Sequence, residues 1–188
     1  MSLPDQSRKF PVSFSRGMAV LGVVAAMAIV SACTVRPLYS NAPMAPGASV
    51  STTTALRSIA IKPVETRYGQ EVRNHLIFGF NGGAGQPASP AYSLNLGVTA
   101  VKTAAAIVQR VTEDEPTAGT MTVASSYVLT EIKTGKVVAR GKRSVSSSYD
   151  IPRQGYAALR AEKNAQDRAA RELAELLQLS IAQDLSKL

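Results

Sequence analysis

Cysteine and histidine each occur once in this chain, as Cys33 and His75. A thiolate can act as a nucleophile, accept a covalent modification or bind a metal, and an imidazole can act as a general base or a ligand. One residue of each type is too few for a disulfide or for the four ligands of a structural zinc site. The composition therefore excludes disulfide scaffolds, zinc fingers and carriers of haem or iron–sulfur clusters.

His75 is the only imidazole available to activate a serine, and its surroundings do not suit that role. The chain has no Gly-x-Ser-x-Gly nucleophile elbow. His75 directly precedes Leu76 in a segment with helical spacing of apolar residues, so we expect it on a helix surface. The acidic run Glu113–Glu115 precedes Pro116 and is expected in a solvated turn. We predict no catalytic residue, no metal ligand and no cofactor, and we expect that the chain is not an enzyme.

Cys33 follows a segment with the pattern of a secretory signal peptide. Basic residues precede an apolar run, Met18–Val30, whose 13 residues fall short of the ~20 that a membrane-spanning helix needs. The run ends at Val30-Ser31-Ala32-Cys33, which resembles the lipobox of bacterial lipoproteins, where the cysteine thiolate accepts a diacylglyceryl group. Cys33 is therefore the predicted lipid anchor. The alternatives are a plain signal peptide with a chance cysteine, or a buried free thiol.

Lipidation at Cys33 divides the chain into three expected parts. Residues 1–32 form the lipoprotein signal peptide, residues 33–55 the lipidated N-terminus and a flexible tether rich in Pro, Ala, Ser and Thr, and residues 56–188 a folded domain. Each buried methylene contributes ~0.8 kcal/mol to the free energy of membrane binding. A cysteine that carries three acyl chains is therefore an almost permanent membrane anchor. Thr34 follows Cys33 at the position where, in bacterial lipoproteins, an aspartate commonly marks retention in the inner membrane. Resemblance to that sorting rule therefore implies the outer membrane.

Hydrophobic periodicity over residues 56–188 predicts an α+β fold. Alternating residues indicate strands, and apolar residues three or four apart indicate amphipathic helices. The expected elements are a strand at 56–64, a helix at 66–80, a strand from 92 to about 111, a strand at 121–129, a turn at 133–136, a strand at 137–149 and a helix at 155–188. The order β-α-β-β-β-α predicts a two-layer sandwich, with a four-stranded, mostly antiparallel sheet and two helices on one face.

Arg143 breaks the alternation of the last predicted strand. Val137, Ala139, Gly141 and Val145 share the parity expected to be buried, and Arg143 falls among them. A bulge near Gly141 would reverse the phase of the strand, and a strand that runs past the end of the core would expose Arg143 without one. Both interpretations are left open by the sequence.

Positive charge is concentrated in the second half of the chain. Without residues 1–32 the chain keeps 18 basic and 12 acidic residues, and residues 131–171 alone contain ten basic and four acidic ones. Lys136, Arg140 and Lys142 are expected in a row on the solvent face of one strand. The candidate anion-binding residues are Lys133, Lys136, Arg140, Lys142 and Arg143. The alternative is a solvated face kept polar against edge pairing. Nucleic acid is not an expected partner, because no stacking aromatics interleave with the charges.

Several segments resemble the LptE family of lipopolysaccharide-assembly lipoproteins in its alphaproteobacterial form. The resemblance covers most of the chain after the signal peptide, and the order and spacing of the segments make it specific. The matching segments are Cys33–Tyr39, Tyr92–Leu94, Ser126–Lys136, Ser148–Asp150 and Gly155–Ala174. The Gly-rich loop at 82–85 and the segment 105–111 depart from the family pattern.

The resemblance implies a non-enzymatic lipoprotein on the periplasmic side of the cell outer membrane. It would assemble with and plug the large β-barrel protein LptD and assist lipopolysaccharide transport to the outer leaflet. Lipopolysaccharide phosphates and acidic sugars would then be the anions met by the basic face. The alternative is a periplasm-facing auxiliary lipoprotein of a transport system that binds a lipid or small solute, for which a closed apolar pocket between helix and sheet would be expected.

Overall fold

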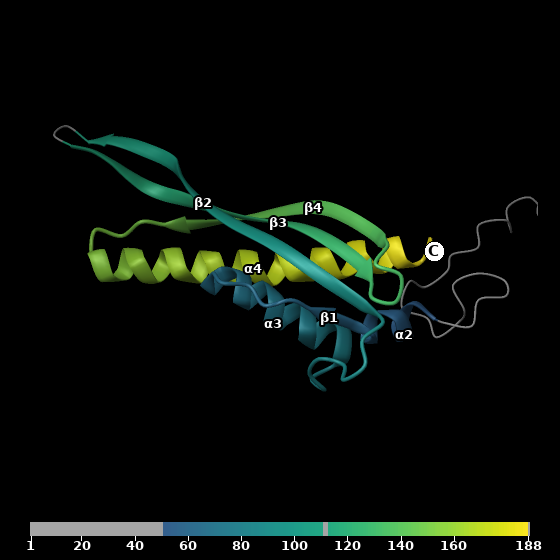
Figure 1. Ribbon diagram of the computed structural model, residues 1–188. Helices are drawn as coiled ribbons and strands as arrows, with labels where there is room; N and C mark the ends of the chain where they lie inside the picture. The colour runs from purple at the N-terminus through teal and green to yellow at the C-terminus, as the bar shows by residue number, and fades with distance from the viewer. Residues whose placement is uncertain (1–50, 111–112, 188) are drawn as a thin grey trace, which may run out of the picture. The chain divides into compact units, whose positions relative to one another are not determined.

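The computed structural model of the chain describes residues 51–110 and 113–187 (Figure 1). Cys33, the predicted signal peptide and most of the predicted tether lie outside these residues. The described elements are α2 (Thr52–Arg57), β1 (Ile59–Ile61), α3 (Arg67–Asn81), β2 (Tyr92–Arg110), β3 (Glu113–Glu131), β4 (Val137–Asp150) and α4 (Gly155–Leu185).

The four strands form one sheet in the order β1-β2-β3-β4. β1 pairs with β2 in parallel, whereas β2 with β3 and β3 with β4 pair antiparallel. The sheet is therefore mixed rather than mostly antiparallel, because the chain crosses through α3 between β1 and β2, as a parallel pair requires. Figure 1 shows α3 and α4 together on one side of the sheet, which confirms the predicted α+β sandwich.

The core lies between this helix pair and the inner face of the sheet. The predicted apolar stripes of both helices are confirmed, except that Leu176 is only half-buried. The inner face alternates with the outer one along each strand, as expected for a sheet covered on one side. The largest side chains that are fully buried include Leu94 of β2, Tyr127 and Leu129 of β3, Leu76 of α3, and Leu173, Leu177, Ile181 and Leu185 of α4.

Both ends of α3 are capped by residues that the sequence makes recognisable. The Thr66 side chain accepts a hydrogen bond from the Gly69 amide at 3.2 Å and satisfies one of the free donors of the first turn. Gly82 ends the helix at φ 59°, in the left-handed region that glycine adopts without a steric penalty. The predicted helix is thereby confirmed within one residue at each end.

Two predicted boundaries are wrong. The strand expected at 56–64 is reduced to Ile59–Ile61, because the residues before it form α2, whose Ala55 and Leu56 are buried. α2 thus includes residues 52–55, which were expected to belong to the tether. The acidic segment Glu113–Pro116 is the first part of β3 rather than a turn.

The β2–β3 hairpin extends beyond the rest of the sheet. β4 reaches β3 no further than the pair Ala118↔Asp150, while β2 and β3 remain paired out to Arg110↔Glu113. Two register irregularities between Ala104 and Ile107 mark the place where this two-stranded extension begins. Figure 1 shows the extension projecting past the end of β4.

Candidate functional site

The basic residues singled out in the sequence belong to the β3–β4 hairpin but not to one surface. Lys133 and Lys136 lie in the turn, where Gly135 adopts φ 70°. Arg140 and Lys142 are exposed on β4, opposite Val128 and Ser126 of β3. The turn is closed by hydrogen bonds from the Glu131 amide to the Lys136 carbonyl and from the Gly135 amide to the Glu131 carbonyl, both 2.9 Å.

A bulge at the start of β4 removes Lys136 from the predicted row. Thr130 pairs with Val137 and Leu129 pairs with Ala139, so Val138 is an extra residue in β4. Because of this extra residue, the residues before Val138 face the side of the sheet opposite to the one that simple alternation predicts. Val137, which was expected to be buried, is accordingly 39% exposed. Only Arg140 and Lys142 therefore share the outer face of the strand.

Arg143 stays on the inner parity of β4, because the register is continuous from Ala139 to Asp150. The strand has no bulge at Gly141, and buried residues continue past Arg143 to Tyr149. Neither interpretation of the sequence therefore explains why a charged residue occupies this position. Arg143 lies opposite Ser125, which is a small, buried residue, and its side chain is half-exposed and donates to the Lys142 carbonyl at 2.8 Å. Arg143 is thus separated from the two cations of the outer face.

Tyr127 fixes this part of the sheet to the C-terminal end of α4. Its hydroxyl donates to Asp184 Oδ2 at 2.6 Å and lies 3.0 Å from Ser180 Oγ. Burial is the largest cause that raises the pKa of Tyr127, and the Asp184 hydrogen bond raises it further. A Cβ at Gly141 would lie 2.7 Å from the Tyr127 ring, so a side chain at position 141 would displace it. The sequence did not reveal this network, because Tyr127 was recognised only as a core residue.

No described element covers the outer face of the sheet (Figure 1). The residues on this face are mostly small and carry hydroxyl groups. Thr122 and Ser146 are hydrogen-bonded across the strands at 2.8 Å, and Thr120 and Ser148 lie 3.5 Å apart. Arg140 and Lys142 interrupt this neutral surface near the β3–β4 turn. The face can therefore donate and accept hydrogen bonds over its length and attract an anion at one end.

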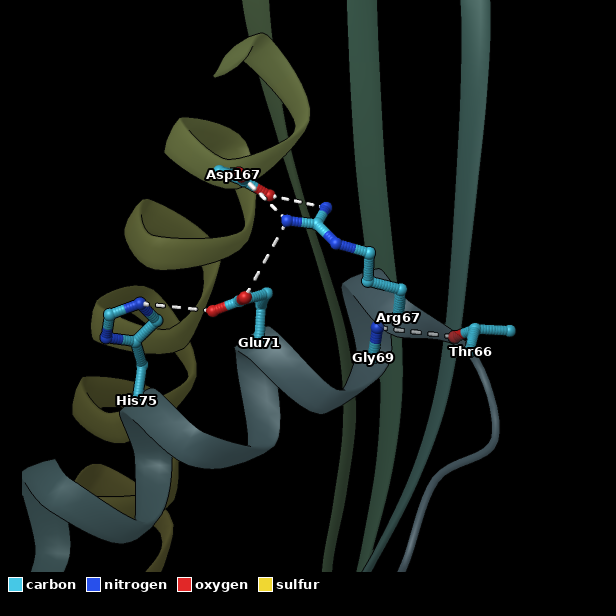
Figure 2. Close-up of polar contacts among 6 residues, drawn as sticks. All are labelled: Thr66, Arg67, Gly69, Glu71, His75 and Asp167. Atoms are coloured by element: carbon cyan, nitrogen blue, oxygen red, sulfur yellow. Dashed lines mark hydrogen bonds and ion pairs between the residues drawn. The ribbon is translucent and has the colours of Figure 1, made fainter. Parts of the chain in front are cut away.

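His75 is at the surface of α3 in a network of charged side chains (Figure 2). Its Nε2 lies 3.9 Å from Glu71 Oε2, and Glu71 lies 3.9 Å from Arg67. Arg67 forms two hydrogen bonds with Asp167 of α4, at 2.9 and 3.2 Å, which raise the pKa of its guanidinium. The network connects α3 to α4 and places no serine or cysteine beside His75 among the described residues.

Residues 51–110 and 113–187 contain no group of three or more His, Cys, Asp and Glu side chains arranged to hold a metal ion. No helix in this part of the chain combines the length and hydropathy of a membrane span.

Two open clefts flank Tyr149 near the start of α4. One, of about 430 Å³, lies between β2 and α4 and is bordered by the Lys102–Glu162 ion pair at 2.9 Å. The other, of about 510 Å³, is lined by the end of β4 and by Arg168, which donates to the Ser148 carbonyl at 2.8 Å. Neither is a closed apolar pocket, since the first is lined by the exposed Thr103, Ala104 and Leu159 and the second by the exposed Asp150 and Asn164.

Comparison with solved structures gives the same architecture in bacterial lipoproteins. A candidate lipoprotein from Caulobacter crescentus CB15 is 27% identical, with a TM-score of 0.56, and the match covers 70% of this chain and 93% of that protein. A minor lipoprotein from Acinetobacter baumannii is 12% identical, with a TM-score of 0.50 and coverages of 69% and 92%, and shares the fold. No functionally curated protein matches the chain.

The profile of the lipopolysaccharide-assembly family LptE matches residues 56–181, which span the sheet, α3 and nearly all of α4. This range is well over half of the 188 residues. The resemblance noted in the sequence is thereby confirmed, and the chain belongs to the LptE family of lipopolysaccharide-assembly lipoproteins.

Proposed function

We propose that this protein is a non-enzymatic lipoprotein of the cell outer membrane that assembles with and plugs an LptD-like β-barrel and assists lipopolysaccharide transport to the outer leaflet. The family match over residues 56–181 carries the proposal. Cys33, at the end of a signal-like segment, supplies the expected lipid anchor on the periplasmic side.

The outer face of the sheet supports the plugging part of the proposal. The interior of a membrane β-barrel is polar, in contrast to its lipid-facing surface. A face of small hydroxyl side chains such as Thr120, Thr122, Ser146 and Ser148 can lie close to a polar wall and exchange hydrogen bonds with it.

Co-purification tests the assembly directly. A C-terminal affinity tag on the full chain, extracted from outer membranes in mild detergent, is expected to recover a large β-barrel protein in stoichiometric amount. A tagged, unrelated outer-membrane lipoprotein extracted in parallel controls for non-specific recovery. Recovery of this chain alone would contradict the proposal.

Arg140 and Lys142 are the strongest candidates for contacts with lipopolysaccharide anions, because they share the outer face while Lys133, Lys136 and Arg143 do not. Replacing both by glutamate is expected to weaken lipopolysaccharide binding by at least about tenfold, since two attractions become repulsions. The loss should be largest at low ionic strength. Binding titrations at two salt concentrations measure it, with Arg160→Glu and Lys163→Glu on α4 as the matched control.

If the variant with Arg140→Glu and Lys142→Glu binds lipopolysaccharide as tightly as the parent chain, the outer face is not the surface that contacts lipopolysaccharide.

The alternative function, an auxiliary lipoprotein that binds a lipid or small solute, has an open cleft in its support but not the closed apolar pocket expected for it. The cleft of about 430 Å³ beside Tyr149 is large enough for a small ligand. Its open form and the charged Lys102 and Glu162 at its border make it a weaker basis than the family match.

A further inference from the structure

Two lysines and two exposed apolar side chains lie together at the β3–β4 turn. Ile132 is 50% exposed and Val137 39% exposed, and Lys133 and Lys136 are exposed between them. Neither lysine is ion-paired within the part of the chain that the structure describes. These four residues are called the turn patch.

The turn patch lies at the end of the domain from which the chain leads towards Cys33. The Ile132 amide donates to the Ala91 carbonyl at 2.9 Å, and the Ala91 amide donates to the carbonyl of Ser58 at 2.9 Å. Ser58 caps the C-terminus of α2, whose six residues extend only about 9 Å back to Thr52. Figure 1 shows α2, the β3–β4 turn and the C-terminal end of α4 at the same end of the domain.

Chain length favours contact between this end and the membrane. Ser51 is 18 positions after Cys33 in the sequence, so the chain between them spans at most about 60 Å. The other end of α4 lies a further 45 Å or so away, because the helix has 31 residues. A leaflet that holds an acyl group on Cys33 therefore meets the turn patch at a much higher effective concentration than it meets the start of α4.

We propose that the turn patch docks the lipoprotein onto anionic phospholipid headgroups of the leaflet that holds its lipid anchor, before a barrel partner is bound. The proposal rests on the proposed lipidation of Cys33. Lys133 and Lys136 contact phosphates, and Ile132 and Val137 enter the boundary between headgroups and acyl chains. The barrel partner would then receive a domain held close to the membrane and oriented by its anchored end.

The start of α4 provides a demanding control for this surface. It also combines exposed apolar and basic residues: Tyr156 is 76% exposed and Leu159 49%, and Arg160 and Lys163 are exposed nearby. If residue composition alone decided membrane binding, the turn patch and the start of α4 would bind equally well. The turn patch differs by its position beside α2, so it is expected to meet the leaflet far more often than the start of α4 does.

The test uses the absence of tryptophan from the chain. Ile132→Trp and, as the control, Leu159→Trp place a single tryptophan, which can be excited selectively, at sites of nearly equal exposure, 50% and 49%. The mature lipoproteins, with acylation checked by mass, are reconstituted in phosphatidylcholine vesicles with or without phosphatidylglycerol. The Ile132→Trp emission is expected to shift to shorter wavelength and to be quenched by brominated lipid only when phosphatidylglycerol is present, while Leu159→Trp stays unchanged.

Removing the lysines should reverse the effect. Each lysine near an anionic surface contributes about 1 kcal/mol, so adding Lys133→Gln and Lys136→Gln is expected to lower the ratio of docked to undocked protein about 25-fold. High salt should act in the same direction.

Three results would overturn the proposal: no quenching at Ile132→Trp in phosphatidylglycerol vesicles, equal quenching at Leu159→Trp, or insensitivity to the lysine substitutions. A chain that lacks acyl groups and does not float with neutral vesicles would instead refute the lipid anchor, and the docking proposal with it. Thermal unfolding of each variant, expected to match that of the parent chain, confirms that the fold is intact.

Discussion

Replacing Cys33 by serine is expected to abolish incorporation of fatty acid into the protein completely. Cys33 is the only cysteine, so no second thiolate can accept the lipid. The measurement is metabolic labelling with an alkyne analogue of palmitate, followed by immunoprecipitation. Membrane fractionation alone is a poorer measurement, because an uncleaved apolar segment at 18–30 would itself hold the chain on the membrane.

Thr34→Ser is the matched control, since it changes the neighbouring residue and leaves the thiol in place. Label that persists in the Cys33→Ser variant would contradict a lipid anchor at this position. Absence of label from the parent chain would contradict it as well.

Truncation of Leu177 to alanine is expected to destabilise the domain by about 2–5 kcal/mol, a large part of the total stability of a domain of this size. Leu177 is fully buried on α4, where the helix packs against both α3 and the sheet. Removal of its side chain leaves a cavity that the surrounding helices and strands can fill only in part. Urea denaturation of the mature protein measures the change in the free energy of unfolding.

Leu179→Ala is the control on the same helix. Leu179 is 40% exposed, so we expect a loss below about 1 kcal/mol. An equal loss for the two variants would mean that α4 does not present the face to the core that the structure gives it.

Much of the fold could be predicted because its signals are local. Thr66 and Gly82 mark the ends of α3, and residues at four-residue spacing such as Val72, Leu76 and Phe80 mark its buried face. Strict alternation around Leu94 and Leu96 likewise defines the inner face of β2. In these segments capping, periodicity and burial all favour the same structure, so a single sequence is sufficient to predict the helix or strand.

The failures occur where pairing, rather than the residue pattern, decides the structure. The acidic residues from Glu113 to Pro116 have the composition of a turn, yet they extend β3 because β2 continues opposite them. Ala55 and Leu56 look like the end of a tether and a strand start, but they form a short helix whose apolar side chains are buried. Tertiary contacts thus override weak local preferences.

The residue types of the basic site could be predicted, but not its arrangement. The sequence places five cations on one hairpin, and alternation alone puts Lys136 in a row with Arg140 and Lys142. The bulge at Val138 depends on the pairing of Thr130 with Val137 and leaves no mark in the composition. That bulge also exposes Val137, which creates the apolar part of the turn patch.

The mass of the mature N-terminal peptide tests most directly whether this chain is a lipoprotein anchored at Cys33, on which its proposed role at the outer membrane depends. The protein is purified from membranes and digested, and the peptide that begins the mature chain is identified. We expect a peptide that starts at Cys33 and carries the added mass of acyl chains. An unmodified peptide, whether it starts at Met1 or at any other residue, would contradict the lipid anchor at Cys33.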